Sequence, residues 1–379
     1  MMLKHFKLAA ALLLLSACFT ACSDDDPTPA PSPTPSRGET GFYVVNQGNS
    51  YSNIAGSIDA VSFTETDTVQ TSGVFNSANG MSLGNSPQKP IIYGTKMYVP
   101  MYAENLVWVI DATTMKKIAS VQTNQPEAVC GSDGYVFVTN NDGNVTRFDT
   151  LSYTPSTPLA VGPNPSGIAA SNGKVYAAIS DGYNGSNGYA DGFKVAQIDA
   201  KNFTLDKQIT VGMNPTSIVA CPDGTLFVVC QGNYGDVLPK VWKIDRTGNA
   251  SAFCDGSLIA VDNQNVSSRS IQKQFVLYVL NVVTNWTWGD ADYGKTTISS
   301  GVYATESGEL LEKDFLPADH MPGSPISMDI NPSTGQLFIC ADASALGYND
   351  PGFVFVYDDN GGFQKKYNVG VHPCGVVFK

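Results

Sequence analysis

The side chains of this sequence that could do chemistry are suited to binding a ligand rather than to catalysing a reaction. Beyond the first 22 residues the chain has two histidines, His320 and His372, and neither lies in a nucleophile motif. It contains no His-Glu-x-x-His sequence, the pattern of zinc peptidases. Its one Gly-x-Ser-x-Gly match, at 80–84, follows a segment rich in Ser, Asn and Gly rather than an apolar strand, so it is not the nucleophile elbow of a serine hydrolase. We therefore expect a protein that is not an enzyme.

Loop aspartates leave open one alternative, a calcium-dependent hydrolase of the lactonase type. Most of them neighbour Gly or Asn, a composition typical of solvated turns. This alternative is therefore less favoured, and we expect no metal and no prosthetic group. The aspartates concerned are Asp142, Asp181, Asp191, Asp290, Asp292 and Asp342.

Tyr, Trp, Asn and Gln gather in the segments that follow apolar runs. Tyr and Trp offer flat amphipathic surface, and Asn and Gln both donate and accept hydrogen bonds. Trp286 and Trp288 are the most distinctive pair, because two indoles in an Asn/Asp/Gly-rich segment have little reason to be in a core. The predicted ligand-binding residues are Asn46, Gln47, Tyr51, Tyr102, Asn140, Tyr183, Gln231, Asn233, Tyr234, Asn281, Trp286, Trp288 and Tyr348.

A sequence repeat of roughly 40 to 50 residues spaces these segments, a period typical of β-propeller blades. Its clearest copy reads Gly-Met-Asn-Pro-Thr-Ser-Ile at 212–218, Leu-Phe-Val-Val at 226–229 and Val-Trp-Lys-Ile-Asp at 241–245. Short apolar runs with period-two alternation and tight turns indicate four antiparallel strands per unit. Aspartates are expected to close the third strands and to bond the backbone of the next turn, at Asp59, Asp111, Asp149, Asp199, Asp245 and Asp358.

Seven such units predict an all-β, seven-bladed β-propeller over residues 41–379. The first unit lacks its leading strand, and residues 370–378 form a turn and a strand with nothing after them. We expect the C-terminal strand to pair with the N-terminal strands and close the ring, which removes an open sheet edge. The second strands are expected near 42–45, 97–101, 135–139, 175–179, 226–229, 275–280 and 337–339.

One face of the predicted ring carries the longest loops. In an up-and-down blade, the connection from the second to the third strand emerges on the same face as the connection between blades. We call this side the long-loop face. Long loops on a rigid scaffold commonly carry binding residues, so ligand is expected here. The long connections are predicted at 181–193, 231–240, 281–295 and 341–352.

Residues 1–21 predict a lipoprotein signal peptide. Lys4 and Lys7 precede an apolar run at 8–15, which is too short to span a membrane. Lipobox-like sequences end at Cys18 and at Cys22. We favour Cys22 as the lipidated residue, with Cys18 as the alternative.

Residues 22–40 are expected to hold the lipidated cysteine, an acidic export signal and a Pro-rich tether. The run Ser-Asp-Asp-Asp at 23–26 resembles the signal that sends Bacteroidetes lipoproteins to the outer face of the outer membrane. A lipid-anchored, cell-surface location is therefore expected.

The net charge and the cysteine spacing indicate which partners and metals are not expected. Without Lys4 and Lys7, 20 basic residues face 34 acidic residues, so nucleic acid is not expected as a partner. No C-x-x-C pair suggests zinc. The sequence does not decide whether or how the cysteines form disulfides, and we favour buried free thiols. The six cysteines beyond the lipobox are Cys130, Cys221, Cys230, Cys254, Cys340 and Cys374.

The repeat resembles the YncE-like, surface-layer type of seven-bladed propeller over nearly all of 41–379. The Cys-Ser-Asp-Asp-Asp start, the Pro-rich tether and the opening Gly-Phe-Tyr-Val-Val-Asn-Gln-Gly at 41–48 are similar to the BtuG surface lipoproteins of gut Bacteroidetes. This resemblance implies capture of cobalamin and its transfer to an outer-membrane TonB-dependent transporter, over which the propeller sits as a lid.

The favoured hypothesis is therefore a surface lipoprotein that binds cobalamin or a related corrinoid as transported ligand. A glycan-binding or protein-docking propeller lipoprotein is the main alternative, since sugar rings stack on indoles as well. The lactonase-like hydrolase comes third.

Overall fold

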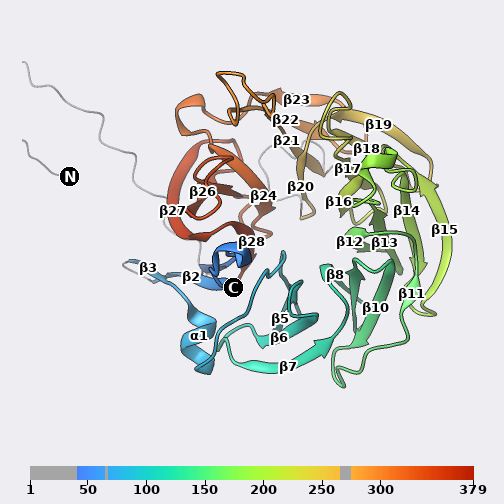
Figure 1. The fold of residues 1–379 in the computed structure, drawn as a ribbon, viewed down its shortest axis with the longest axis vertical. Helices are drawn as coiled ribbons and strands as arrows, with labels where there is room; N and C mark the ends of the chain where they lie inside the picture. The colour runs from blue at the N-terminus through green and yellow to red at the C-terminus, as the bar shows by residue number, and fades with distance from the viewer. Residues whose placement is uncertain (1–40, 65–66, 265–274) are drawn as a thin grey trace, which may run out of the picture. The chain divides into compact units, whose positions relative to one another are not determined.

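The computed structural model of the chain describes residues 41–64, 67–264 and 275–379. The predicted signal peptide, lipidation site and tether lie outside these residues. The described part forms seven four-stranded antiparallel sheets that follow one another around a ring (Figure 1). The predicted seven-bladed propeller is confirmed, and all seven second strands lie where the repeat placed them.

Blades II to VII follow the chain, each with its first strand innermost. Blade II holds β4 (Ile91–Tyr93), β5 (Lys96–Met101), β6 (Leu106–Asp111) and β7 (Lys117–Gln122). Blade III holds β8 (Pro126–Ser132), β9 (Tyr135–Asn140), β10 (Asn144–Asp149) and β11 (Leu159–Ala160). Blade IV holds β12 (Pro165–Ser171), β13 (Lys174–Ile179), β14 (Lys194–Asp199) and β15 (Thr204–Thr210).

The remaining blades have the same order. Blade V holds β16 (Pro215–Ala220), β17 (Leu226–Cys230), β18 (Lys240–Ile244) and β19 (Ala250–Asp255). Blade VI holds β20 (Leu258–Asp262), β21 (Val276–Thr284), β22 (Thr296–Ala304) and β23 (Leu310–Lys313). Blade VII holds β24 (Ser324–Ile330), β25 (Leu337–Asp342), β26 (Pro351–Tyr357) and β27 (Phe363–Val371).

Blade I joins the two ends of the described chain. Its strand order is β28 (Pro373–Phe378), β1 (Gly41–Asn46), β2 (Ser57–Phe63) and β3 (Thr68–Thr71). β28 pairs antiparallel with β1, with Val376 opposite Val44. Phe42 of β1 meets Phe338 of blade VII edge-on, with ring centroids 5.0 Å apart. The predicted closure is confirmed, and apolar packing between blades I and VII stabilises it.

A repeated joint precedes the innermost strand in five of the seven blades: a residue of positive φ, between 44° and 55°, is followed by a proline. The proline is the first residue of β8, β12, β16 and β28, and in blade II it is Pro87, which forms an isolated bridge to Met101 ahead of β4. The carbonyl of that residue accepts the amide N–H of the residue after the blade's second strand. These bonds are Tyr102 to Ser86 (3.1 Å), Asn141 to Gln125 (3.0 Å), Ser180 to Asn164 (3.2 Å), Gln231 to Asn214 (2.9 Å) and Gln47 to His372 (2.8 Å). Because proline lacks an N–H, it stands where the ladder needs none.

The third-strand aspartates mostly behave as predicted. Asp111 Oδ1, for example, accepts the amide N–H of Thr113 at 3.1 Å and of Thr114 at 2.7 Å. The prediction is wrong for Asp59, which lies inside β2 and is buried. Its carboxylate accepts the Asn46 side chain and the amides of Gly73 and Gly370, so it ties blade I to the turns beside it.

The connections differ from the prediction in two places. β21 extends to Thr284, so Asn281 lies in a strand rather than in a loop. Residues 72–90 form a long connection between blades I and II that was not predicted, and it carries α1 (Val74–Asn79). Short 3₁₀ turns occur as η1 (Ser50–Ser52), η2 (Gly185–Asn187) and η4 (Ala318–His320).

Deleting residues 373–379 should destabilise the whole propeller. The deletion removes β28, exposes an edge of β1 and uncovers two buried valines, each worth about 1.5–3 kcal/mol. We expect a loss of about 4 kcal/mol or more in urea unfolding, against a much smaller loss when Lys379 alone is removed. An unfolding midpoint equal to that of the parent would contradict the closure.

Candidate functional site

Exposed aromatic side chains gather on one face of the ring. Among the described residues, six aromatic side chains are exposed, and all six lie on connections from a second to a third strand. The opposite face and the outer strands therefore have none among these residues. The six are Tyr51, Tyr183, Tyr234, Trp286, Trp288 and Tyr348.

The same face is acidic. The described connections on it hold ten Asp or Glu residues and two lysines. Both lysines are paired, Lys89 with Asp329 at 2.5 Å and Lys295 with Asp292 at 3.5 Å. An anionic ligand would find no unpaired lysine or arginine on these connections, so the face favours an uncharged or a cationic ligand.

The loop after β21 in blade VI carries two of the six exposed aromatic side chains. The rings of Trp286 and Trp288 both meet Tyr293 edge-on, with centroids 5.7 and 5.4 Å apart. Trp288 is 87% exposed. The loop is held by its own bonds, since Asn285 Oδ1 accepts the Thr287 amide at 2.8 Å. The two indoles thus form an open aromatic platform on an ordered turn.

Two tyrosines of blades II and IV meet over blade III. The hydroxyls of Tyr102 and Tyr183 lie 2.8 Å apart, and Asn141 Nδ2 donates to both, at 3.1 and 2.7 Å. Asn164 Nδ2 holds Asn141 by donating to its Oδ1 at 2.9 Å. The hydrogen bond with Tyr102 is the largest cause that raises the pKa of Tyr183, to about 12. One bond between the phenols uses one hydroxyl proton, so the other can be donated to a ligand.

Asn164 is not among the ligand-binding residues predicted from the sequence, although it supports the tyrosine pair. Its turn conformation, with φ of 44°, brings its amide under the tyrosine pair. The signal was present in the Gly-Pro-Asn-Pro turn at 162–165, but its link to Tyr183 depends on the loop that follows β13.

Two of the predicted amides lie inside the blades. Asn46 and Asn140 each end a second strand and are 1% exposed. Asn46 Nδ2 donates to Asp59 at 2.9 Å, and Asn140 Nδ2 donates to Thr146 at 2.9 Å. In this structure their side chains hold neighbouring strands together and are not at the surface.

The other predicted amides are partly engaged with the protein. Gln231 Nε2 donates to the carbonyl of Ser257 at 3.3 Å, and Asn233 closes its own loop through Asp236 at 2.7 Å. Gln47 is half-buried, as is Asn281 within β21. The predicted tyrosines and tryptophans thus face solvent, with Tyr102 half-buried, while the predicted amides mainly support the loops.

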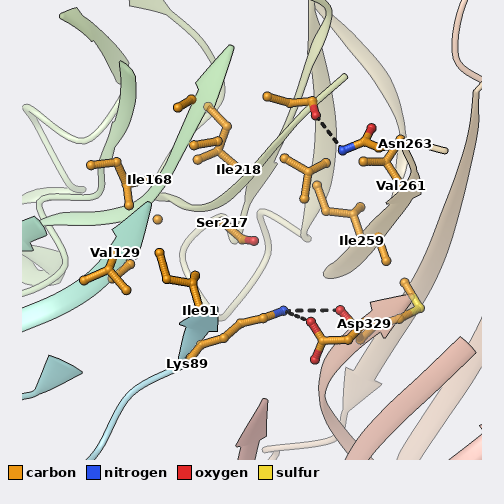
Figure 2. A pocket seen from close by; sticks show the side chains of 18 of the residues that line it. Lys89, Ile91, Val129, Ile168, Ser217, Ile218, Ile259, Val261, Asn263 and Asp329 are labelled. Carbon is orange, nitrogen blue, oxygen red and sulfur yellow. Dashed lines mark hydrogen bonds and ion pairs between the residues drawn. The ribbon is translucent and has the colours of Figure 1, made fainter. Parts of the chain in front are cut away.

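A central cavity of about 400 Å³ lies along the innermost strands (Figure 2). Small apolar side chains line most of it, including Val129, Ile168 and Ile218. Burial works to lower the pKa of Lys89, but Asp329 outweighs it and the pKa is raised, so the lysine stays charged. None of the predicted ligand-binding residues lines this cavity.

Glu127 stands near the long-loop end of β8. The side chain is largely buried, and burial raises the pKa of its carboxyl to about 7. Glu127 also contributes to the raised pKa of Tyr183, which places its charge near the tyrosine pair.

The described residues show no grouping of three His, Cys, Asp or Glu side chains that could hold a metal ion. The six cysteines that the described ranges contain are free, with Cys254 half-buried and the others buried. Within the described ranges, no helix is long and apolar enough to cross a membrane.

Comparison with known proteins supports the fold. A family described as a domain of unknown function, DUF5074, matches residues 40–379. No curated protein matches the sequence.

Three solved structures share the architecture. Hydrazine synthase from Kuenenia stuttgartiensis has a TM-score of 0.60 at 18% identity, covering 76% of this chain and 88% of that one. A quinoprotein alcohol dehydrogenase-like protein from Bacteroides thetaiotaomicron has a TM-score of 0.58 at 15% identity, covering 90% and 78%. A protein of unknown function from Desulfotomaculum acetoxidans has a TM-score of 0.52 at 11% identity, covering 74% and 81%. At these identities the likeness shows the fold alone.

Replacing Glu127 by Gln should change how stability depends on pH. The folded-state pKa of about 7 lies above the ordinary value of 4.5, so the folded protein holds a proton that the unfolded chain releases. This contribution is complete below pH 4.5 and is lost as the pH rises through 7. At pH 8, E127Q should therefore be more stable than the parent, by up to about 3 kcal/mol, and the gain should vanish near pH 4.5.

Urea unfolding at pH 4.5 and pH 8 measures this difference. Glu309→Gln, which neutralises an exposed carboxyl on the opposite face, is the matched control. Its stability should differ little from that of the parent at either pH. An equal stability difference between E127Q and the parent at both pH values would contradict the assignment.

Proposed function

This chain belongs to the DUF5074 family, and we propose that it is a non-enzymatic binding module that captures cobalamin or a related corrinoid on its long-loop face. The observation that carries the proposal is the confinement of all six exposed aromatic side chains of the described residues to that face.

The chemistry of a corrinoid suits this surface. A corrinoid is a broad disc fringed with amides and carrying a nucleotide tail, so it needs apolar area and hydrogen bonds around its edge. Tyr and Trp supply the area, and the Tyr102–Tyr183 pair has a hydroxyl proton to donate. Cyanocobalamin has no net charge, which agrees with a face that lacks unpaired cations.

A rigid ring also favours tight capture. Loops that are already ordered by their own bonds lose little freedom when a ligand binds. The similarity of residues 22–26 and 41–48 to BtuG lipoproteins supports the same ligand, a lipid anchor at Cys22 on the cell surface, and transfer to a TonB-dependent transporter.

A neutral glycan is the second candidate, because the open platform of Trp286 and Trp288 could stack sugar rings. A protein-docking role would use the same surface, and a lactonase-like hydrolase remains the third alternative.

Calorimetry tests the ligand. The mature chain, residues 23–379 without lipid, should bind cyanocobalamin with one site and submicromolar affinity, and should give no heat with neutral oligosaccharides. Heat from oligosaccharides and none from any corrinoid at micromolar concentrations would replace this proposal by the glycan alternative.

Replacing Trp286 and Trp288 together by Ala should weaken cyanocobalamin binding at least tenfold and leave the melting temperature unchanged, because both side chains are exposed. Leu151→Ala, which alters an 82% exposed side chain on the opposite face, is the control and should bind like the parent. A stability loss of about 3 kcal/mol or more would instead make the indoles packing residues.

A further inference from the structure

His372 stands at the long-loop end of the closing blade, in the turn between β27 and β28. Its Nδ1 lies 2.9 Å from Asp342 Oδ2, and the two side chains are 32% and 11% exposed. Asp342 is the last residue of β25. The imidazole is therefore held at the face that carries the exposed aromatic residues.

The fold does not require an imidazole at this position. Ser86, Gln125, Asn164 and Asn214 fill the same joint in other blades, with the same positive φ and the same carbonyl bond. The turn therefore forms without an imidazole, so the backbone conformation alone does not explain the histidine.

The contact with Asp342 selects the tautomer of a neutral ring. A carboxylate accepts hydrogen bonds, so Nδ1 carries the proton and the lone pair of a neutral ring lies on Nε2. Within the described part of the chain, Nε2 has no hydrogen-bond partner. A carboxylate that orients a histidine in this way is the usual support of a metal-ligating imidazole.

The loops around His372 belong to the long-loop face. The loops after β1 and β25 meet beside His372, where Asn49 Nδ2 donates to Tyr348 O at 3.2 Å and to Asn349 Oδ1 at 2.9 Å. The loop after β1 is bonded to the histidine turn through Gln47 N and His372 O, at 2.8 Å. These two loops carry the exposed side chains of Tyr51 and Tyr348.

We propose that His372, positioned by Asp342, supplies an axial nitrogen ligand to the metal of the captured macrocycle; this rests on the proposed function. No three metal-ligating side chains of the described residues are grouped, so the protein does not offer a full ligand set for a free ion. A macrocycle brings its own four equatorial nitrogens and leaves an axial position that one neutral imidazole can fill.

Aquocobalamin tests this, because its axial water exchanges. The cobalt–oxygen bond to water breaks, a cobalt–Nε2 bond forms, and water leaves with no change of oxidation state. The mature parent should shift the visible absorption bands of aquocobalamin at one equivalent. His372→Asn, a residue that the same joint accepts in blades IV and V, should bind without that shift and at least tenfold more weakly.

Calorimetry with cyanocobalamin separates the two hypotheses. If the parent binds corrinoids but shows no shift with aquocobalamin, the axial-ligand proposal is contradicted. The same holds if H372N shows the same shift as the parent. In both cases the proposed capture of a corrinoid is retained. If neither corrinoid binds the parent, the proposed function fails and the ligand assignment fails with it.

Discussion

The backbone ladder between β28 and β1 is the constraint on which the other features depend. Without it, blade I would be a three-stranded sheet with a bare edge, and the apolar surfaces of blades I and VII would lose their partner. With it, every blade packs between two neighbours. Loops that emerge from such a closed ring keep fixed positions relative to one another, and residues from different blades can then form one surface.

Polar side chains on the long-loop face divide into two roles. The amides mostly hold the scaffold: Asn46 and Asn140 brace strands, and Asn164 supports the tyrosine pair through Asn141. The exposed aromatic rings stand on this frame. Each role suits its side chain: a carboxamide both donates and accepts hydrogen bonds, whereas an aromatic ring supplies contact area with few rotatable bonds.

Much of the fold could be predicted from local pattern, because each blade repeats the same turns and apolar alternation. The seven second strands and the closure by residues 373–378 follow from counting those units. Long-range contacts could not be predicted in this way. Asp59 has the sequence setting of a turn aspartate, but its partners Asn46 and Gly370 come from other parts of the chain. The 72–90 connection, with α1, has no counterpart in the repeat.

The candidate site could be predicted as a surface and less well as single residues. Composition identified the tyrosines and tryptophans that are exposed, since aromatic residues in turn-rich segments have no core to enter. It did not separate the half-buried or buried amides from the accessible ones, because burial of Asn140 depends on Thr146 across the strand pair. The pairing of His372 with Asp342 joins residues 30 apart in the chain.

The two ends of the propeller lie together. The amide of Lys379 donates to the carbonyl of Gly41 at 3.0 Å. β1 runs toward the long-loop face and β28 runs away from it, so both ends are on the opposite face. A reporter fused to the C-terminus, or an immobilisation tag placed directly before Gly41, would leave the ligand loops facing solution. A short linker between the ends would also permit circular permutation, with new termini opened in any minimal turn of the opposite face.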